Sequence, residues 1–332
     1  MKIVKFLFLG IGLYILFITL RTVGVAVIVS TISQLRWQLL PLLVIYPFIF
    51  AFDTLGWHYS FPKKLSHPVP FPDLYAIRII GETLNCVIPW AASLGGEPIK
   101  AELLKTRHGV PLSEGYASIL IVHTTFWLSL NLFVIGGILV TLRTHPLSPL
   151  LWVSVLAFLL SLGLVAVLLI IGLHLGIFKK VHALGEAFKW WGPHSEEKGL
   201  RFLKLDDEIK KFYTRNPKLF FLSTFFNFLG WLTGILEVYF IARALGLPMG
   251  FAQAWLFEAL IQVLRIVTFF IPSSVGAQEG GIVFLFSQFG YGSPASLAFA
   301  IIRRIREVIW LGLGLLLWLA IEDRPVIRRG LR

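Results

Sequence analysis

The chain of 332 residues is 57% hydrophobic, has a mean hydropathy of +0.80 and is only 14% charged, which excludes an ordinary soluble domain and predicts a protein embedded in a bilayer. Its formal net charge is +12, but Lys and Arg concentrate between apolar segments and at the C-terminus, as the positive-inside rule requires, so we expect no nucleic-acid partner. A single cysteine excludes an intramolecular disulfide, and the eight histidines form no metal-binding pattern, so neither a metal nor another cofactor is expected.

Eight strongly apolar stretches follow one another along the chain, and each reaches or approaches the about 20 residues that a helix needs to cross the hydrocarbon core. The first follows Lys2 and Lys5 as in a signal peptide, but no convincing cleavage site follows, so we interpret it as a retained span. The sequence predicts an all-α polytopic membrane protein, with residues 1–332 forming a single integral membrane domain. The stretches cover residues 4–20, 39–57, 74–94, 115–142, 150–175, 219–242, 251–271 and 296–321.

The basic loops determine the expected topology. Residues 178–218 are rich in Lys and Arg and form a basic cytoplasmic connection, either an amphipathic segment at the membrane surface or a solvated linker. The N-terminus, the Lys63-Lys64 loop and the basic C-terminus are placed in the cytoplasm as well. Residues 74–97 must then enter and leave from the cytoplasmic side, and residues 251–290 from the outer side. We expect about six full transmembrane helices plus two broken re-entrant helical hairpins, in the cytoplasmic (inner) membrane.

The two hairpins point in opposite directions, which is the pattern of inverted repeats whose broken helices meet at a site near the bilayer midplane. The first half-repeat covers residues 39–142 and the second covers residues 219–321. When Glu97 is aligned with Glu279, prolines and glycines of the two copies also fall within one position of each other. The expected structural hinges of the hairpins are Pro89, Gly95, Gly96, Pro272 and Gly276.

Charged residues interrupt the same apolar segments. A charge at a helix centre costs on the order of 2.5–3.5 kcal/mol on insertion scales, so each such residue needs a partner or a function. Guanidinium groups match phosphate oxygens in two-point contacts, which suits the headgroup of a phospholipid. We therefore predict a path for a lipid headgroup lined by Glu97, Lys100, Glu258, Arg265, Gln278, Glu279, Arg303, Arg304, Arg306 and Glu307.

The arginine group has an alternative interpretation. Arg303, Arg306 and Glu307 share one helical face, and Arg304 is rotated away from it by about 100°. Three arginines in one apolar span are difficult to leave unpaired. Salt bridges to glutamates of the same region are therefore the alternative to a role in binding phosphate.

Three further carboxylates are interpreted separately. Glu97 lies between two glycines and Pro98, a good helix start, so it either ends a hairpin at the interface or lies beside helix N-termini that attract anionic oxygens. Glu237 and Asp53 are more isolated in the sequence. Each is interpreted mainly as a capped or snorkelling residue.

Two motifs resemble those of a known family. The first is Gly-Gly-Glu-Pro-x-Lys at residues 95–100, followed by Gly-Val-Pro-Leu-Ser-Glu-Gly at residues 109–115. The second is Pro-Ser-Ser-Val-Gly-Ala-Gln-Glu-Gly-Gly at residues 272–281, with the arginines downstream. Nearly the whole chain resembles the flippase-like transmembrane family, typified by the membrane half of lysyl-phosphatidylglycerol synthase. The resemblance implies a multi-pass membrane protein that handles amphiphilic lipids. This family usually carries a Glu-Arg type pair where the chain has His123-Thr124, which implies an altered first half-site.

The resulting hypothesis is a lipid flippase or transporter that moves an amphiphilic lipid, with an anionic or polar headgroup, between leaflets. A membrane-embedded lipid aminoacyl- or glycosyltransferase is one alternative. The chain has no phosphate-binding loop, no Asp-x-Asp pair and no nucleophile beside a base, so catalysis is the weaker hypothesis. A noncatalytic partner of a lipid-biosynthesis enzyme is the other alternative. Membrane lipids are the expected partners of the chain.

Overall fold

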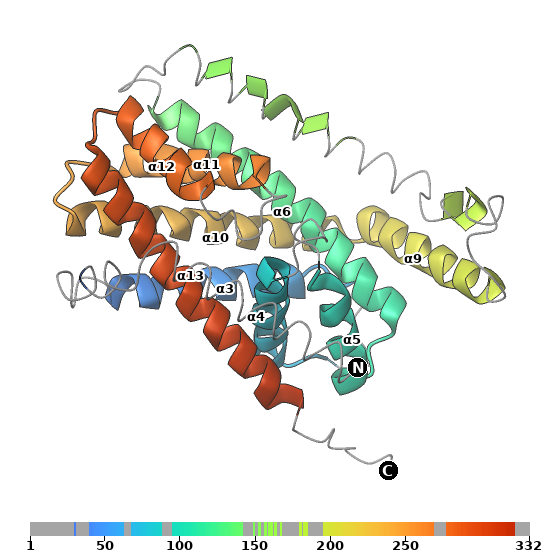
Figure 1. The fold of residues 1–332 in the computed structure, drawn as a ribbon. Coiled ribbons are helices and arrows are strands. Elements are labelled where there is room, and N and C mark those ends of the chain that lie inside the picture. The colour runs from blue at the N-terminus through green and yellow to red at the C-terminus, as the bar shows by residue number, and fades with distance from the viewer. Residues whose placement is uncertain are drawn as a thin grey trace.

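The computed structural model describes residues 40–62, 68–87, 95–141, 195–268 and 277–322, together with Ser30 and single residues between 149 and 184. All regular elements among these residues are α-helices (Figure 1), which confirms the predicted all-α class. The helices are α3 (Leu40–His58), α4 (Phe71–Val87), α5 (Glu97–His108), α6 (Leu112–Thr141), α9 (Ser195–Arg215), α10 (Pro217–Ala244), α11 (Phe251–Val267), α12 (Ala277–Gln288) and α13 (Ser293–Glu322).

Three of these helices, α3, α6 and α10, are long and apolar enough to cross a membrane. α13 is as long as α6, but a group of charged residues at 303–307 interrupts its apolar sequence. The fold is thus that of a helical membrane protein. The number of full spans and the orientation in the bilayer stay predictions, and the first predicted span, residues 4–20, lies outside the described residues.

Two sets of three helices repeat with the same lengths. α4, α5 and α6 have 17, 12 and 30 residues, and α11, α12 and α13 also have 17, 12 and 30 residues. After the middle helix of each set, a glycine adopts a positive φ, 67° at Gly109 and 75° at Gly290. Glycine is favoured there because this left-handed conformation strains residues that carry a Cβ atom.

The packing of the helices repeats as well. α6 contacts α11 as α13 contacts α4, and α5 contacts α6 as α12 contacts α13. Figure 1 shows the α11–α12 pair and the α4–α5 pair on opposite sides of α10. α4 lies within the first expected hairpin, residues 74–97, except for its first turn, and α5 begins where that hairpin was expected to end, while α11 and α12 both lie within the second, residues 251–290. The connecting residues 88–94 and 269–276 lie outside the described part of the chain, so the hairpins stay predictions. The boundaries of the half-repeats stay predictions.

α3 and α10 pack side by side at the centre of the bundle and run antiparallel (Figure 1). The Ser60 hydroxyl, two residues beyond the end of α3, hydrogen-bonds the Ser223 hydroxyl of α10 at 2.9 Å. One turn before Ser60, Gly56 of α3 faces Asn227, which lies one turn after Ser223 on α10. A Cβ atom on Gly56 would lie only 2.3 Å from Asn227 Oδ1. The absence of a side chain at Gly56 thus permits the close approach of the two helices.

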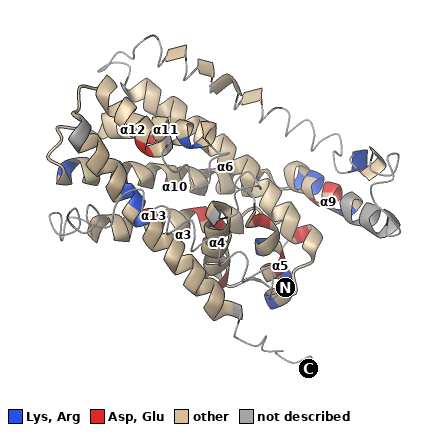
Figure 2. Ribbon diagram, viewed as in Figure 1, with Lys and Arg blue, Asp and Glu red and all other residues tan. Residues whose placement is uncertain are grey.

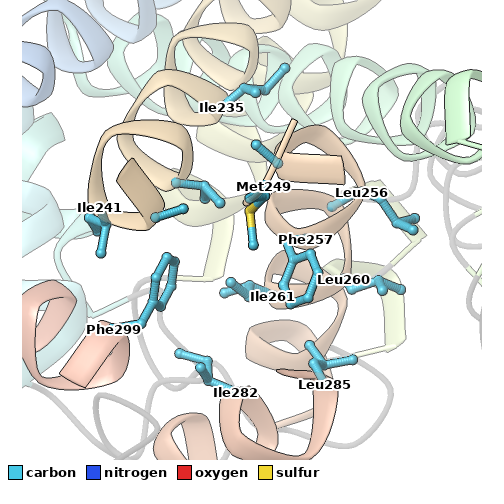
Figure 3. Packing of buried hydrophobic residues seen from close by; sticks show 14 of the residues in the cluster. Ile235, Ile241, Met249, Leu256, Phe257, Leu260, Ile261, Ile282, Leu285 and Phe299 are labelled. Carbon is cyan, nitrogen blue, oxygen red and sulfur yellow. The ribbon is translucent and has the colours of Figure 1, made fainter. Parts of the chain in front are cut away.

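The largest apolar core lies where α6 and α10 meet α11, α12 and α13 (Figure 3). Phe257 of α11 and Phe299 of α13 both pack against Phe286 of α12, with ring centroids 4.9 Å apart in each pair. Met249, from the loop before α11, is buried beside Phe257 in the same core. This packing fixes the positions of α11, α12 and α13, which carry most of the predicted site.

The predicted connection 178–218 contains the helix α9. Ile209 and Phe212 of α9 are fully buried against Ile121 of α6, whereas Lys204 and Lys210 are exposed. α9 is therefore amphipathic, as one of the two alternatives held, but its apolar face packs against the protein. Residues 195–215 of the connection thus form a helix packed on α6, and its place at the membrane surface stays a prediction.

Candidate functional site

Most charged residues of α3, α4, α5, α11, α12 and α13 gather in two groups. Figure 2 shows basic residues on one stretch of α13, whereas most of α6 and α10 consists of uncharged residues. The first cluster comprises Asp53, Arg78, Glu82, Asn85, Glu97, Lys100 and His123. The second cluster comprises Glu237, Glu258, Gln262, Glu279, Arg303, Arg304, Arg306 and Glu307.

Lys100 lies at the centre of the first cluster. Its Nζ atom is 2.9 Å from a carboxylate oxygen of Glu82 and 2.9 Å from one of Glu97, and its side chain is only 2% exposed. Asn85 Nδ2 donates to Glu97 Oε1 at 3.0 Å, and Asn85 Oδ1 accepts from the backbone N–H of Gly96 at 2.7 Å. The cluster therefore ties the end of α4 to the first turn of α5.

Gly96, one of the predicted hinges, lies against the backbone of α4. Its φ of −80° and ψ of −16° are ordinary right-handed values that any residue adopts. A Cβ atom on Gly96 would lie 2.0 Å from the carbonyl oxygen of Gly81, so close packing of α5 on α4 requires a glycine there. Of the other predicted hinges, Gly95 lies in the turn before α5, and Pro89, Pro272 and Gly276 lie outside the described residues.

Arg78 completes the first cluster, and the sequence analysis missed it. Its Nη2 atom lies 3.3 Å from Asp53 Oδ2 and 3.7 Å from Glu82 Oε1. Asp53 was expected to be isolated and is instead ion-paired across the α3–α4 contact. At the other end of the cluster, His123 Nε2 lies 3.8 Å from Glu97 Oε1.

Arg303 and Arg306 hold the buried part of the second cluster. Arg303 Nη1 donates to Glu258 Oε2 at 2.5 Å, and its Nε atom lies 3.9 Å from Glu237 Oε1. Arg306 Nη1 donates to the other carboxylate oxygen of Glu237, which makes this residue, expected to be isolated, a bridge between two arginines. Gln262 Nε2 donates to Glu258 Oε1 at 2.5 Å.

Arg304 points to a different neighbour from Arg303 and Arg306. Its guanidinium lies 2.6 Å from Glu279 of α12 and 2.8 Å from Glu307. Glu307, expected on the face of Arg303 and Arg306, pairs with Arg304, because residues three apart on a helix also adjoin. Gln278, the neighbour of Glu279, is buried as well.

The arginines of α13 thus adopt the salt-bridged arrangement that was the alternative to phosphate binding. Arg265, on the last turn of α11, differs from them, because it is half-buried and takes part in no ion pair with a described residue. The undescribed segments 88–94 and 269–276 contain no acidic residue either. Arg265, Arg304, Glu307 and Glu82 all lie within electrostatic range of the Cys86 thiol, so the end of α4 is close to both clusters.

A family model described as the lysylphosphatidylglycerol synthase TM region matches residues 3–315 of the chain. The chain belongs to this family. No curated protein and no solved structure gives a match. Membership confirms the resemblance drawn from the two glycine-rich motifs, and together with the apolar helices α3, α6 and α10 it makes the chain a lipid-related membrane domain.

Within this transmembrane region the polar positions follow the helical repeat. The eighth, twelfth and fifteenth residues of α4 and of α11 are all polar or charged, so one stripe along each helix faces its cluster. His123 and Arg304 are both the twelfth residue of their helices, α6 and α13. The two stripes are Arg78, Glu82 and Asn85 on α4, and Glu258, Gln262 and Arg265 on α11.

Proposed function

We propose that this transmembrane domain binds the phosphate-bearing headgroup of an amphiphilic lipid between its two clusters and moves the lipid between leaflets. The observation that carries the proposal is Arg265, a half-buried guanidinium whose donors are used by no carboxylate among the described residues. We also propose, from the basic loops, that the domain lies in the cytoplasmic membrane with both termini inside.

The surroundings of Arg265 favour an anionic group as its ligand. A guanidinium in an apolar environment needs a counter-charge, and its planar fork matches two phosphate oxygens at once. Every arginine of α13 already binds a glutamate, so these side chains hold the shape of the site, whereas Arg265 pairs with no carboxylate among the described residues. A phosphate there would reach the ends of α4 and α11, near Cys86.

The ion pairs between helices suit a protein that changes shape around its ligand. Each cluster links a broken-hairpin pair to other helices of the bundle, α3 and α6 in the first cluster, α10 and α13 in the second. In such a cluster an ionised side chain that leaves one partner has another oppositely charged side chain nearby. A path for a headgroup requires this, because an unpaired charge in an apolar environment is costly. The name of the family makes an aminoacylated phosphatidylglycerol the first lipid to test.

The proposal is tested by reconstituting the purified chain in liposomes and measuring leaflet exchange of labelled phosphatidylglycerol and its lysyl derivative. A hydrogen bond to a charged group contributes about 1.5–3 kcal/mol, so Arg265→Ala should slow exchange by about tenfold or more. Arg265→Lys should retain part of the rate, because lysine keeps the charge but not the fork.

Arg243→Ala is the matched control, because Arg243 is exposed and its guanidinium interacts with the side chain of Tyr239 in the same helix. Exchange at the wild-type rate in Arg265→Ala would contradict the proposal. Chemical modification of the lipid by the purified chain would indicate a transferase instead.

A further inference from the structure

His123 and Arg304 occupy equivalent places in the two halves. Each is the twelfth residue of a 30-residue helix, and each faces a glutamate in the first turn of the preceding 12-residue helix. His123 Nε2 lies 3.8 Å from Glu97, and Arg304 Nη2 lies 2.6 Å from Glu279. The second half therefore uses a permanent cation where the first half uses an imidazole, the side chain that changes charge between about pH 5 and 8.

The net charges of the two clusters differ by one when the His123 imidazole is neutral and are equal when it is protonated. With Arg265 included, the second cluster has equal numbers of arginines and glutamates (Arg265, Arg303, Arg304 and Arg306; Glu237, Glu258, Glu279 and Glu307). The first cluster has two permanent cations and three carboxylates (Arg78 and Lys100; Asp53, Glu82 and Glu97). Protonated His123 gives the first cluster the same balance.

We propose that His123 and Glu97 form a proton-binding pair that switches the first cluster from a net negative charge to neutrality. Its effect on lipid exchange rests on the proposed function, but its proton binding does not. An anionic headgroup is repelled by the negative state and accepted by the neutral one. Exchange is therefore faster at low pH.

The hydrogen bonds of the ring show which nitrogen takes the proton. His123 Nδ1 lies 2.8 Å from the carbonyl oxygen of Ile119, an acceptor only, so Nδ1 carries the hydrogen in the neutral ring. Nε2 then holds the lone pair and faces Glu97. Protonation adds one proton from water to Nε2 and points the new N–H at the carboxylate. The side chain is 30% exposed, which leaves the ring accessible.

The neighbours of His123 include one further carboxylate and one cation. Glu82 of α4 lies within electrostatic range of the ring, and Lys100 of α5 pairs with both Glu82 and Glu97. From α9, the hydroxyl of Tyr213 hydrogen-bonds Thr124, and burial raises the pKa of Tyr213 to about 12, so it stays neutral. Among the described residues of α3, α10 and α11, none forms an ion pair with His123.

The first test compares the pH dependence of lipid exchange in four proteins. The protonated fraction of an ordinary imidazole falls about tenfold from about pH 5.5 to 7.5, so wild-type exchange should slow by roughly that factor. His123→Arg should be fast at both pH values, and His123→Gln slow at both. His58→Gln, an exposed histidine at the end of α3, should follow the wild type. A wild-type pH profile in either His123 variant would overturn the proposal.

A second test does not depend on lipid exchange. NMR of the purified protein with ring-labelled histidine identifies the His123 signal as the one lost in His123→Gln. Glu97→Gln should move the titration of the His123 signal to lower pH, because the Glu97 carboxylate stabilises the imidazolium. Glu114→Gln, on the same helix as His123, should leave that titration unchanged. A His123 signal that does not titrate between about pH 5 and 8, or that ignores Glu97→Gln, would overturn the inference even if no lipid is exchanged.

Discussion

The guanidinium of Arg303 and the carboxylate of Glu258 form a buried ion pair that joins α13 to α11, with 2.5 Å between the closest atoms and side-chain exposures of 1% and 3%. Such a pair contributes little net stability, because both charges lose their hydration. Removing only one of the two charges is costly, because the remaining charge is left unpaired in an apolar environment. The pair therefore sets the contact between the two helices more than it strengthens the fold.

Glu258→Gln should destabilise the protein by about 3–5 kcal/mol, because Arg303 then keeps only the more distant Glu237. The measurement is unfolding in detergent, followed by circular dichroism. The double variant Glu258→Leu with Arg303→Met should recover most of the loss, since neither charge remains. A double variant as unstable as the single one would show that packing, and not the stranded charge, is responsible.

Gly56→Ala should destabilise the α3–α10 contact by about 1–3 kcal/mol, because the new methyl group overlaps Asn227. The midpoint of thermal unfolding in detergent measures the effect. Gly312→Ala on α13 is the control, since no atom lies within 4 Å of its new Cβ. Equal midpoints for the two variants would contradict the close approach of α3 and α10.

Gly96→Ala should displace α5 from α4 and break the hydrogen bond from the Gly96 N–H to Asn85, because the Cβ atom meets the backbone of Gly81. We expect about 1–3 kcal/mol of lost stability, again from thermal unfolding. Gly280→Ala, at an open position in the first turn of α12, is the control and should be tolerated. Tolerance of Gly96→Ala would instead support a flexible hinge.

Cys86 should report occupation of the proposed site, because it is the single cysteine and lies within electrostatic range of Arg265 and Glu82. Adding an anionic phospholipid to the detergent-solubilised protein should slow alkylation of Cys86 by a maleimide. A lipid of neutral headgroup serves as the comparison. Arg265→Ala should abolish the protection, and protection that survives this change would place the lipid elsewhere.

Much of the fold followed from apolar runs and from helix-start residues. α5 begins at Glu97, next to Pro98, as the glycine-proline pattern predicted, and α3 and α10 lie close to the expected limits. These features are local, so the sequence carries them directly. The internal repeat was also visible, because its glycines recur at similar spacing.

The ion-pair partners of the site were harder to predict, because they come from distant parts of the chain. Glu237 looked isolated, yet its partner Arg306 is 69 residues away. Asp53 likewise pairs with Arg78, 25 residues away, and no local pattern links them. A signal for Arg78 did exist, since it holds the same position in α4 as Glu258 in α11, but the opposite charges concealed the match.

The crossed packing of α6 on α11 and of α13 on α4 means that each half buries part of its surface against the other. α3 and α10 run antiparallel at the centre, and a long helix of each half covers a shorter helix of the other half. A polypeptide limited to one half would leave these surfaces uncovered. Because α4 packs on α13 and α11 packs on α6, a shift of either shorter helix alters its contact with a long helix of the other half.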